Sequence, residues 1–337
     1  MFEKITSLGE SYFAYAKTFF TYPINPNERL FIIYLLTSLL FAYVLYRKRK
    51  SNESFKDFLF PSAVWNHPSA WLDLRYFFFH GLIGHFVVYI LVAGALISGL
   101  SLTMSFEAFQ SFKAAAPPDS IYRWIVAGIA VIALTAITDF FAFLLHYMQH
   151  KIPLLWQFHK VHHSGEVMHP LTNFREHPVD NLTYDFILKF IHGAALGLIM
   201  IFLGFIPDAM TILGVGVFSV AFNIAGYQLR HSHIWLRWPG NWSKVFPSPA
   251  HHHVHHSRHP EHLDKNFAFM FPIWDVLFKT YEMPEDNRNV EFGIVEDSSE
   301  LNSCINLYLI PFRDAYRILR KTTPKDKATA IATSPPA

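Results

Sequence analysis

The sequence predicts an all-α protein, a polytopic transmembrane helical bundle with a cytoplasmic-facing helical cap that carries histidine boxes. Of its 337 residues, 52% are hydrophobic and only 16% are charged, whereas soluble domains carry about 25% charged residues. Five apolar stretches reach the roughly 17–20 residues that a helix needs to cross a bilayer. The third observation is the distribution of histidine, because 17 of the 20 histidines lie between His146 and His262.

The apolar stretches divide the chain into three parts. These are an N-terminal segment, 1–29, a membrane-embedded domain, 30–281, and a C-terminal tail, 282–337. The expected spans are about 30–46, 76–100, 124–146, 190–206 and 209–229. The last two are joined at Pro207 and Asp208, which favours a tight helical hairpin. In the tail, 305–320 is expected to form an interfacial amphipathic helix broken at Pro311, and 321–337 a disordered end.

Basic residues orient these spans. The run RKRK at 47–50 follows the first span and is expected on the cytoplasmic side. Alternating five spans from there places segments 47–75, 147–185 and 230–337 on that side, with 6, 3 and 13 Lys or Arg, against 3 and 2 in segments 1–29 and 101–123. The N-terminus then lies on the opposite face. Of the 17 clustered histidines, 16 fall on the cytoplasmic side or at the cytoplasmic end of the third span.

Charge and cysteine content exclude several classes of protein. A net charge of +2 lacks the basic excess of nucleic-acid-binding proteins, so no nucleic-acid partner is expected. Cys304 is the single cysteine, which excludes a disulfide framework and zinc sites built from several thiolates. The sequence also has no dinucleotide fingerprint outside the apolar stretches and no C-x-x-C-H haem motif.

The histidines form boxes with helical spacing. His146 and His150 are four residues apart and share one helical face. HKVHH at 159–163 and HHHVHH at 251–256 both contain the spacing H-x-x-H-H, and His231 directly follows the last span. Neutral imidazole is a strong ligand of iron, zinc and copper, and these boxes offer too many ligands for one tetrahedral ion but suit two metals. The candidate ligands are His146, His150, His159, His162, His163, His231, His252, His255 and His256.

Other polar residues are expected to support or to flank this site. Carboxylates near the boxes are expected to orient ring N–H groups, namely Asp139, Asp180, Asp185, Asp264 and Asp275. Asp139 lies inside a span, where an ionisable group indicates function, and we expect it to contact His146 or His150. Bystander roles are expected for the remaining clustered histidines, with His259, His262 and His169 on solvated surface or loops and His251 and His253 beside the third box.

Several motifs between 139 and 281 carry a family resemblance. They are DFFAFLLHYMQHKIPLLWQFHKVHHS from Asp139, the element Arg175-Glu176-His177-Pro178, His231, PSPAHHHVHHS at 247–257 and WDVLFKT at 274–280. As a set they resemble the fatty acid hydroxylase and sterol desaturase superfamily of membrane non-haem di-iron enzymes. The sequence departs from the family at Lys279, where glycine is expected, and at His233, where many members have asparagine.

The resemblance implies an activity and its requirements. Two irons per chain, bound by the nine candidate histidines, would use O2 to hydroxylate or desaturate a C–H bond of a lipid in lipid biosynthesis or modification. Asp139, His177 and His233 would support the ligands. Sterols, fatty acyl chains, alkylglycerols and aminolipids all occur as substrates in this superfamily. Electrons would come from an external cytochrome, ferredoxin or flavoprotein reductase. Phenylalanines of the spans are candidates for a lipid groove: Phe77, Phe78, Phe79, Phe140, Phe141 and Phe143.

Three alternatives fit parts of the pattern. A zinc-dependent membrane hydrolase would explain the metal ligands, but the sequence has no H-E-x-x-H. A non-enzymatic metal-binding or transport protein would place its ligands near the bilayer midplane rather than at one face. A b-type cytochrome would need paired histidines within its spans.

Overall fold

A computed structural model describes residues 2–49, 52–84, 86, 88, 95–105, 121–203, 218–284 and 289–321. In these residues the regular structure is helical, with one isolated bridge between Ser257 and Phe292. The all-α prediction is therefore confirmed for this part of the chain. Its α-helices are α1 (Phe2–Phe20), α2 (Ile32–Lys48), α3 (Phe55–Leu59), α4 (Ser62–Trp65), α5 (Pro68–Phe79), α7 (Ala95–Met104), α9 (Ile121–Lys151), α10 (Pro153–His163), α11 (Pro178–Leu203), α13 (Pro249–His255), α14 (Ile273–Phe278) and α15 (Cys304–Lys321).

Short helical turns connect these helices. A π-helical turn, η2 (His80–Gly84), continues α5. The 3-10 turns are η1 (Tyr22–Ile24), η3 (Pro170–Phe174), η4 (Tyr227–His231), η5 (Gly240–Lys244) and η6 (Pro260–His262). The turn η4 begins after Gly226, whose backbone has a φ of +86°. Glycine adopts this left-handed conformation without steric cost, so the chain reverses there and presents His231 to the interior.

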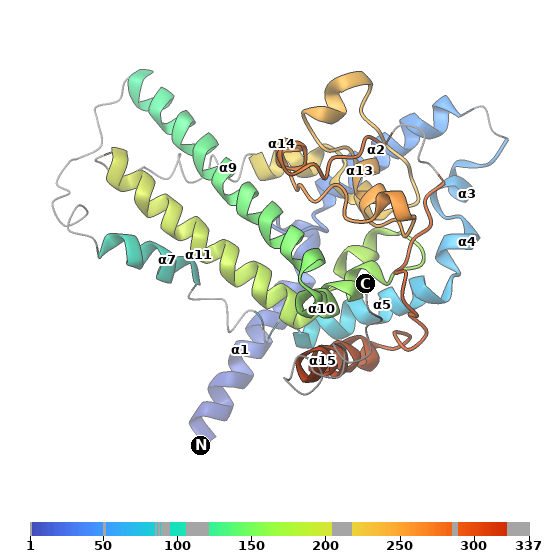
Figure 1. Ribbon diagram of the computed structural model, residues 1–337, viewed down its shortest axis with the longest axis horizontal. Helices are drawn as coiled ribbons and strands as arrows, with labels where there is room; N and C mark the ends of the chain where they lie inside the picture. Colours follow the sequence, from blue (N-terminus) through green and yellow to red (C-terminus); the bar gives the residue numbers. More distant parts are fainter. Residues whose placement is uncertain are drawn as a thin grey trace, which may run out of the picture.

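Two long apolar helices, α9 and α11, extend side by side away from the rest of the protein (Figure 1). Within the described residues, Ile125–Lys151 and Pro178–Leu203 are the two helices long and apolar enough to cross a membrane. Only 33% and 22% of their most apolar windows are buried, unlike the core helices of a soluble domain. Helix α7 packs closely on α11 at Gly99. A Cβ added there would collide with the carbonyl oxygen of Phe190, so this approach requires glycine.

The boundaries of the predicted spans need correction. The third span lies within α9, and the first corresponds to α2. The fourth belongs to a helix that begins at Pro178, well before the predicted residue 190. The second, 76–100, begins inside α5, which starts at Pro68 and continues into the π turn His80–Gly84, and residues 89–94 of this span lie outside the described residues. Of the fifth, only residues 218–229 are described, and they end in η4.

The C-terminal helix differs from its prediction at one point. Helix α15 runs without a break from Cys304 to Lys321 and includes Pro311, so the predicted interruption there is wrong. Its Asp314 accepts a hydrogen bond from Lys160 of α10 at 2.8 Å. The hairpin at Pro207 and Asp208 and the tail beyond residue 321 lie outside the described residues.

Proline residues set the bend that brings the first two boxes together. Helix α9 ends at Lys151, and α10 starts at Pro153, whose missing N–H is tolerated at the first helical position. Helix α10 then folds back against the end of α9. A hydrophobic core between α5, α10 and α15 fixes this position, and its buried members are Leu72, Tyr76, Val161, Ile294, Leu301 and Leu307. The histidines of α10 therefore face those of α9.

Candidate metal centre

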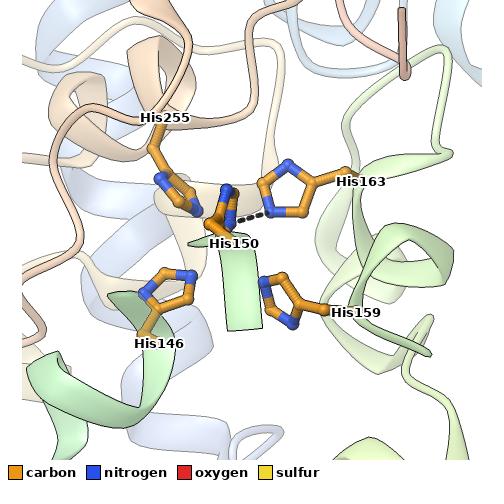
Figure 2. Close-up of side chains that lie close together, drawn as sticks. All are labelled: His146, His150, His159, His163 and His255. Carbon is orange, nitrogen blue, oxygen red and sulfur yellow. Dashed lines mark hydrogen bonds between the residues drawn. The ribbon is translucent and has the colours of Figure 1, made fainter. Parts of the chain in front are cut away.

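The nine histidines that the sequence singled out lie together in two groups. The five-histidine group contains His146 and His150 of α9, His159 and His163 of α10, and His255 of α13. The four-histidine group contains His162 of α10, His231 of η4, and His252 and His256 at the end of α13. In each group, one ring nitrogen per residue lies within 4.8 Å of all the others. Figure 2 shows the rings of the five-histidine group pointing toward a common centre.

Helical spacing divides each H-x-x-H-H box between the two groups. On α10, His159 and His163 are four residues apart and face the five-histidine group, while His162 faces the other. On α13 the pattern is reversed, because His252 and His256 face the four-histidine group and His255 faces the five-histidine group. The two groups touch where the rings of His163 and His256 stack, with their centroids 4.3 Å apart. The structure is thus suited to two adjacent metal ions.

The Nδ1 atoms of five of these rings point outward to oxygen acceptors. The distances are 2.9 Å from His146 to the Phe267 carbonyl, 2.8 Å from His255 to the Lys265 carbonyl, 2.9 Å from His159 to Asp180, 3.3 Å from His162 to the Arg175 carbonyl and 3.5 Å from His150 to Asp264. Carbonyl and carboxylate oxygens only accept hydrogen bonds, so Nδ1 carries the proton in the four rings that form such bonds, His146, His159, His162 and His255. The Nε2 lone pair then faces the interior of the group, as metal binding requires.

The Nε2 atoms converge inside both groups. They approach one another to 3.1 Å between His150 and His163, 3.3 Å between His162 and His231, 3.0 Å between His231 and His252, and 2.9 Å between His252 and His256. The Nε2 atoms of His159 and His255 are buried and find no hydrogen-bond donor in the described residues. An unpaired buried acceptor is costly, and a divalent ion would satisfy it. The donor set therefore fits metal binding.

Burial keeps these rings neutral. Removal from water lowers the pKa of His162 to about 4, an effect strengthened by His159, and lowers that of His255 to about 3. The pKa values of His163, His252 and His256 fall well below the usual value of histidine, mainly through burial and then through neighbouring histidines. Neutral imidazole is the form that binds metals, so the site holds its ligands ready at neutral pH.

The carboxylates predicted to support the ligands act in two ways. Asp180 and Asp264 contact ligand rings directly, and Asp180 also accepts a hydrogen bond of 2.6 Å from Gln149. Asp139 is different, because its carboxylate accepts from the backbone N–H groups of Met270 and Phe271 and from the Trp274 indole at 2.9–3.0 Å. The prediction that Asp139 contacts His146 or His150 directly is therefore wrong.

Asp139 and Asp275 together shape the loop that precedes α14. Asp275 accepts hydrogen bonds of 2.8 Å from the N–H groups of Phe267 and Ala268. This loop carries the Phe267 carbonyl to which His146 donates. The two aspartates thus reach the metal centre through the backbone of the loop, and Asp185 lines the polar cavity described below.

The other candidate histidines lie outside the two groups. His177 accepts from the Val179 N–H and contacts the Tyr308 carbonyl at 3.0 Å, so it ties the start of α11 to α15. His233 contacts the Phe58 carbonyl at 2.8 Å. The bystanders His251 and His253 contact Tyr281 and the Leu229 carbonyl. His262 is buried beside Ser257, which corrects its assignment to solvated surface. His169 lies in a loop, as predicted, but is buried beside Asp73 rather than solvated.

Lys279, where the family has glycine, forms the left-handed residue that ends α14. Its φ is +61°, a conformation that usually selects glycine after a helix. The turn therefore forms with lysine in place of glycine, and the Thr280 N–H still donates to the Asp275 carbonyl at 2.8 Å.

Two cavities meet beside the histidines. A polar cavity of about 140 Å³ is lined by histidines of both groups and by polar residues that the sequence did not single out, namely Arg29, Glu176, Tyr184, Tyr227 and Arg230. An apolar cavity of about 520 Å³ lies next to it, between segment 218–249 and the loop before α14. Tyr227 and Arg230 line both cavities. The candidate phenylalanines lie elsewhere; Phe143, for example, packs on Phe267 and Phe278.

Comparison with known proteins agrees with this geometry. The sequence model of the fatty acid hydroxylase family matches residues 131–280. This segment, a little under half of the chain, is thus similar to the fatty acid hydroxylase family. It spans most of α9, all of α10, most of the cavity walls and all nine candidate ligands, so the resemblance inferred from the motifs is confirmed.

Curated relatives of the chain include lipid-modifying enzymes. The alkylglycerol monooxygenase of Caenorhabditis elegans is 28% identical over 189 residues, which cover 55% of this chain and 32% of the relative. The human alkylglycerol monooxygenase is 29% identical over 178 residues, or 53% of this chain and 34% of the relative. The ornithine lipid hydroxylase OlsE of Rhizobium tropici is 27% identical over 172 residues, or 51% and 47%. The chain thus matches about a third of the length of the alkylglycerol monooxygenases. No solved structure matches it.

Proposed function

We propose that this protein is a membrane-bound, O2-dependent oxidoreductase that hydroxylates or desaturates a C–H bond of a lipid at a histidine-ligated di-iron centre. The observation that carries the proposal is the convergence of nine histidines, seven of them buried, into two adjacent groups. One group offers five ligand nitrogens and the other four, which is more than one ion uses and enough for two. The family match and the two relatives that hydroxylate lipids support the same reaction class.

Each group would hold one iron, and iron bound there would supply the activation of O2 and the oxidation of an unactivated C–H bond. The protein's own part is to position the ligands. Asp180 and three backbone carbonyls accept the Nδ1 protons of four of the rings and so aim their Nε2 lone pairs inward, and Asp264 lies 3.5 Å from Nδ1 of His150. Histidines of both groups line the polar cavity, so a reacting carbon placed there would lie beside the residues that would hold the metals.

The cavities and helices support a lipid as substrate. The apolar cavity beside the centre suits a hydrocarbon chain, and the polar cavity suits the end that carries oxygen or nitrogen. The two exposed apolar helices α9 and α11 favour a site at the edge of a membrane, where a lipid reaches it without crossing water. One relative is named for an alkylglycerol and another for an ornithine lipid. We propose that the substrate of this protein is a related membrane lipid.

The proposal includes the topology inferred from charge. The chain crosses the membrane several times, its N-terminus lies outside, and the histidines face the cytoplasm, where RKRK at 47–50 is expected. A cytoplasmic site is accessible to an external electron donor, a cytochrome, ferredoxin or flavoprotein, which supplies two electrons per reaction. A role in lipid biosynthesis or modification follows from the reaction.

A zinc-dependent hydrolase or a metal-binding and transport protein is the alternative. In the described residues the two histidine groups contain no glutamate, and Glu176, which lines the polar cavity, is paired with Arg29 at 2.9 Å. Metal analysis separates these alternatives, because a hydrolase would hold zinc as its active metal and a transport protein would release its metal reversibly.

Comparative lipidomics tests the proposal. Cells that express the protein should contain a lipid that has gained one oxygen atom or lost two hydrogen atoms relative to cells without it. Cells that express His150→Ala should lack this product, and cells that express His259→Ala, which changes a histidine outside both groups, should retain it. Identical lipid profiles in all four strains, with the protein present in the membrane and the host able to supply electrons, would contradict the proposal.

A further inference from the structure

Arg230 stands at the junction of the two cavities. It directly precedes the candidate ligand His231, and its side chain lines both the polar cavity and the apolar cavity. Tyr227, one helical turn earlier, shares this position. Arg230 and Tyr227 therefore border both the apolar cavity and the polar cavity that contains the histidines.

The guanidinium of Arg230 is buried, and no hydrogen-bond acceptor for it is found among the described residues. Arg230 is 5% exposed, and its Nε finds no partner in the described residues. Three aromatic rings surround it instead, with the guanidinium carbon 5.6 Å from the centres of Phe222 and Tyr227 and 5.2 Å from that of Phe269. Cation–π contacts recover only part of the cost of removing a charge with five N–H donors from water. A group that brings oxygen acceptors and negative charge would complete this environment.

Arg29, the other arginine that lines the polar cavity, differs from Arg230 because it is paired with an anion. Arg29 donates to Glu176 at 2.9 Å and to the Asn173 carbonyl at 2.8 Å, and the Glu176 carboxylate raises the pKa of its guanidinium. Asp139, the carboxylate that acts on Arg230 from α9, is already occupied by three donors of the loop before α14. Arg230 is thus the cation of this cavity that lacks a paired anion in the described part of the chain.

We propose that Arg230 binds an anionic oxygen-bearing group, a carboxylate or a phosphate, of the lipid substrate, whose hydrocarbon chain occupies the apolar cavity. This inference rests on the proposed lipid-oxidising function and narrows its substrate class to anionic or zwitterionic amphiphiles. The planar guanidinium matches both oxyanions because it donates two parallel hydrogen bonds. The aromatic rings hold it in one orientation at the mouth of the apolar cavity.

Quenching of tryptophan fluorescence tests the proposal, because Trp238 and Trp242 line the apolar cavity. The probes are dibrominated stearic acid, the matching dibrominated stearyl alcohol and the matching alkyl phosphate, added to the full-length, metal-loaded protein in detergent at a pH at which the acid is ionised. A charge-assisted hydrogen bond contributes about a tenfold to hundredfold gain in affinity. We expect the acid or the phosphate to bind at least about tenfold more tightly than the alcohol, and the stronger of the two identifies the anion.

Arg230→Met should abolish this preference and leave the affinity for the alcohol unchanged. Arg258→Met is the matched control, because Arg258 is exposed, pairs with Glu291 and lines neither cavity. The metal content of each variant shows that its fold is retained.

Equal affinities of the wild-type protein for acid, phosphate and alcohol would overturn the anion site and leave the lipid hydroxylase proposal standing. Failure of all three probes to bind the metal-loaded protein would overturn both. Equal loss of acid and alcohol binding in Arg230→Met would show a structural role and also overturn the anion site.

Discussion

Asp180 is predicted to hold His159 in its metal-binding orientation. One carboxylate oxygen lies 2.9 Å from Nδ1 of His159, and the other accepts from the Gln149 amide at 2.6 Å. Asp180→Asn keeps the shape but offers only one oxygen. If that oxygen faces His159, the new NH2 group opposes the NH2 group of Gln149, and if it faces Gln149, His159 loses its acceptor.

Asp180→Asn should therefore weaken metal binding. Removing a partner that orients a metal-binding histidine costs about tenfold to hundredfold in metal affinity, or about 1.4–2.8 kcal/mol. Competition with a chelator, followed by metal analysis, measures this loss on the purified protein. The double variant Gln149→Glu with Asp180→Asn restores a donor opposite an acceptor and should recover part of the affinity. Asp297→Asn, a change at an exposed carboxylate that belongs to neither histidine group, should have no effect.

Two results would refute this reasoning. Unchanged metal affinity in Asp180→Asn would show that the contact with His159 does not support metal binding. An equal loss in the single and the double variant would show that negative charge, rather than the direction of the hydrogen bonds, is what matters at residue 180.

Three further predictions concern the ligands, the turn after α14 and the sidedness of the membrane. His255→Ala should lose metal and activity because its Nε2 points into the five-histidine group, whereas His259→Ala should retain both; metal analysis of the two variants checks this, and a silent His255→Ala would show that the ligand register in the third box is wrong. Lys279→Gly should raise the free energy of unfolding by about 1 kcal/mol, since glycine adopts a φ of +61° without strain; a thermal or denaturant melt that shows destabilisation instead would contradict the account of this turn. In a Cys304→Ala background, a cysteine at Ser298 should react with a membrane-impermeant label only after the membrane is opened, and one at Ser7 should react in intact cells; labelling of both from outside would contradict the five-span topology.

The candidate ligands could be recognised in the sequence because their chemistry is local. Histidines at helical spacing must share a face, so His159, His162 and His163 could be assigned together from their spacing alone. The crosswise division of the two boxes between the groups could not be predicted, because it depends on how α10 and α13 cross. That crossing is set by packing and by the bend at Pro153, rather than by either box alone.

The surroundings of the centre depend on contacts between distant parts of the chain. Asp139 shares a helical face with His146, yet its carboxylate is taken up by backbone N–H groups of a loop more than a hundred residues later. The phenylalanines predicted to form a groove pack on other aromatic side chains, as Phe140 does on Trp274. The apolar cavity instead lies between segment 218–249 and the loop before α14, where no periodic pattern marked it. Arg230 could have been noticed only as the neighbour of His231.

The central claim is that two metals bind side by side in histidine-lined groups, and metal stoichiometry tests it most directly. Protein purified after expression without excess zinc should contain close to two irons per chain, because nine converging histidines exceed the needs of one ion. His252→Ala and His146→Ala should each lower this number, since they alter different groups. One metal or fewer per chain in protein handled to preserve its metals would contradict the di-iron account.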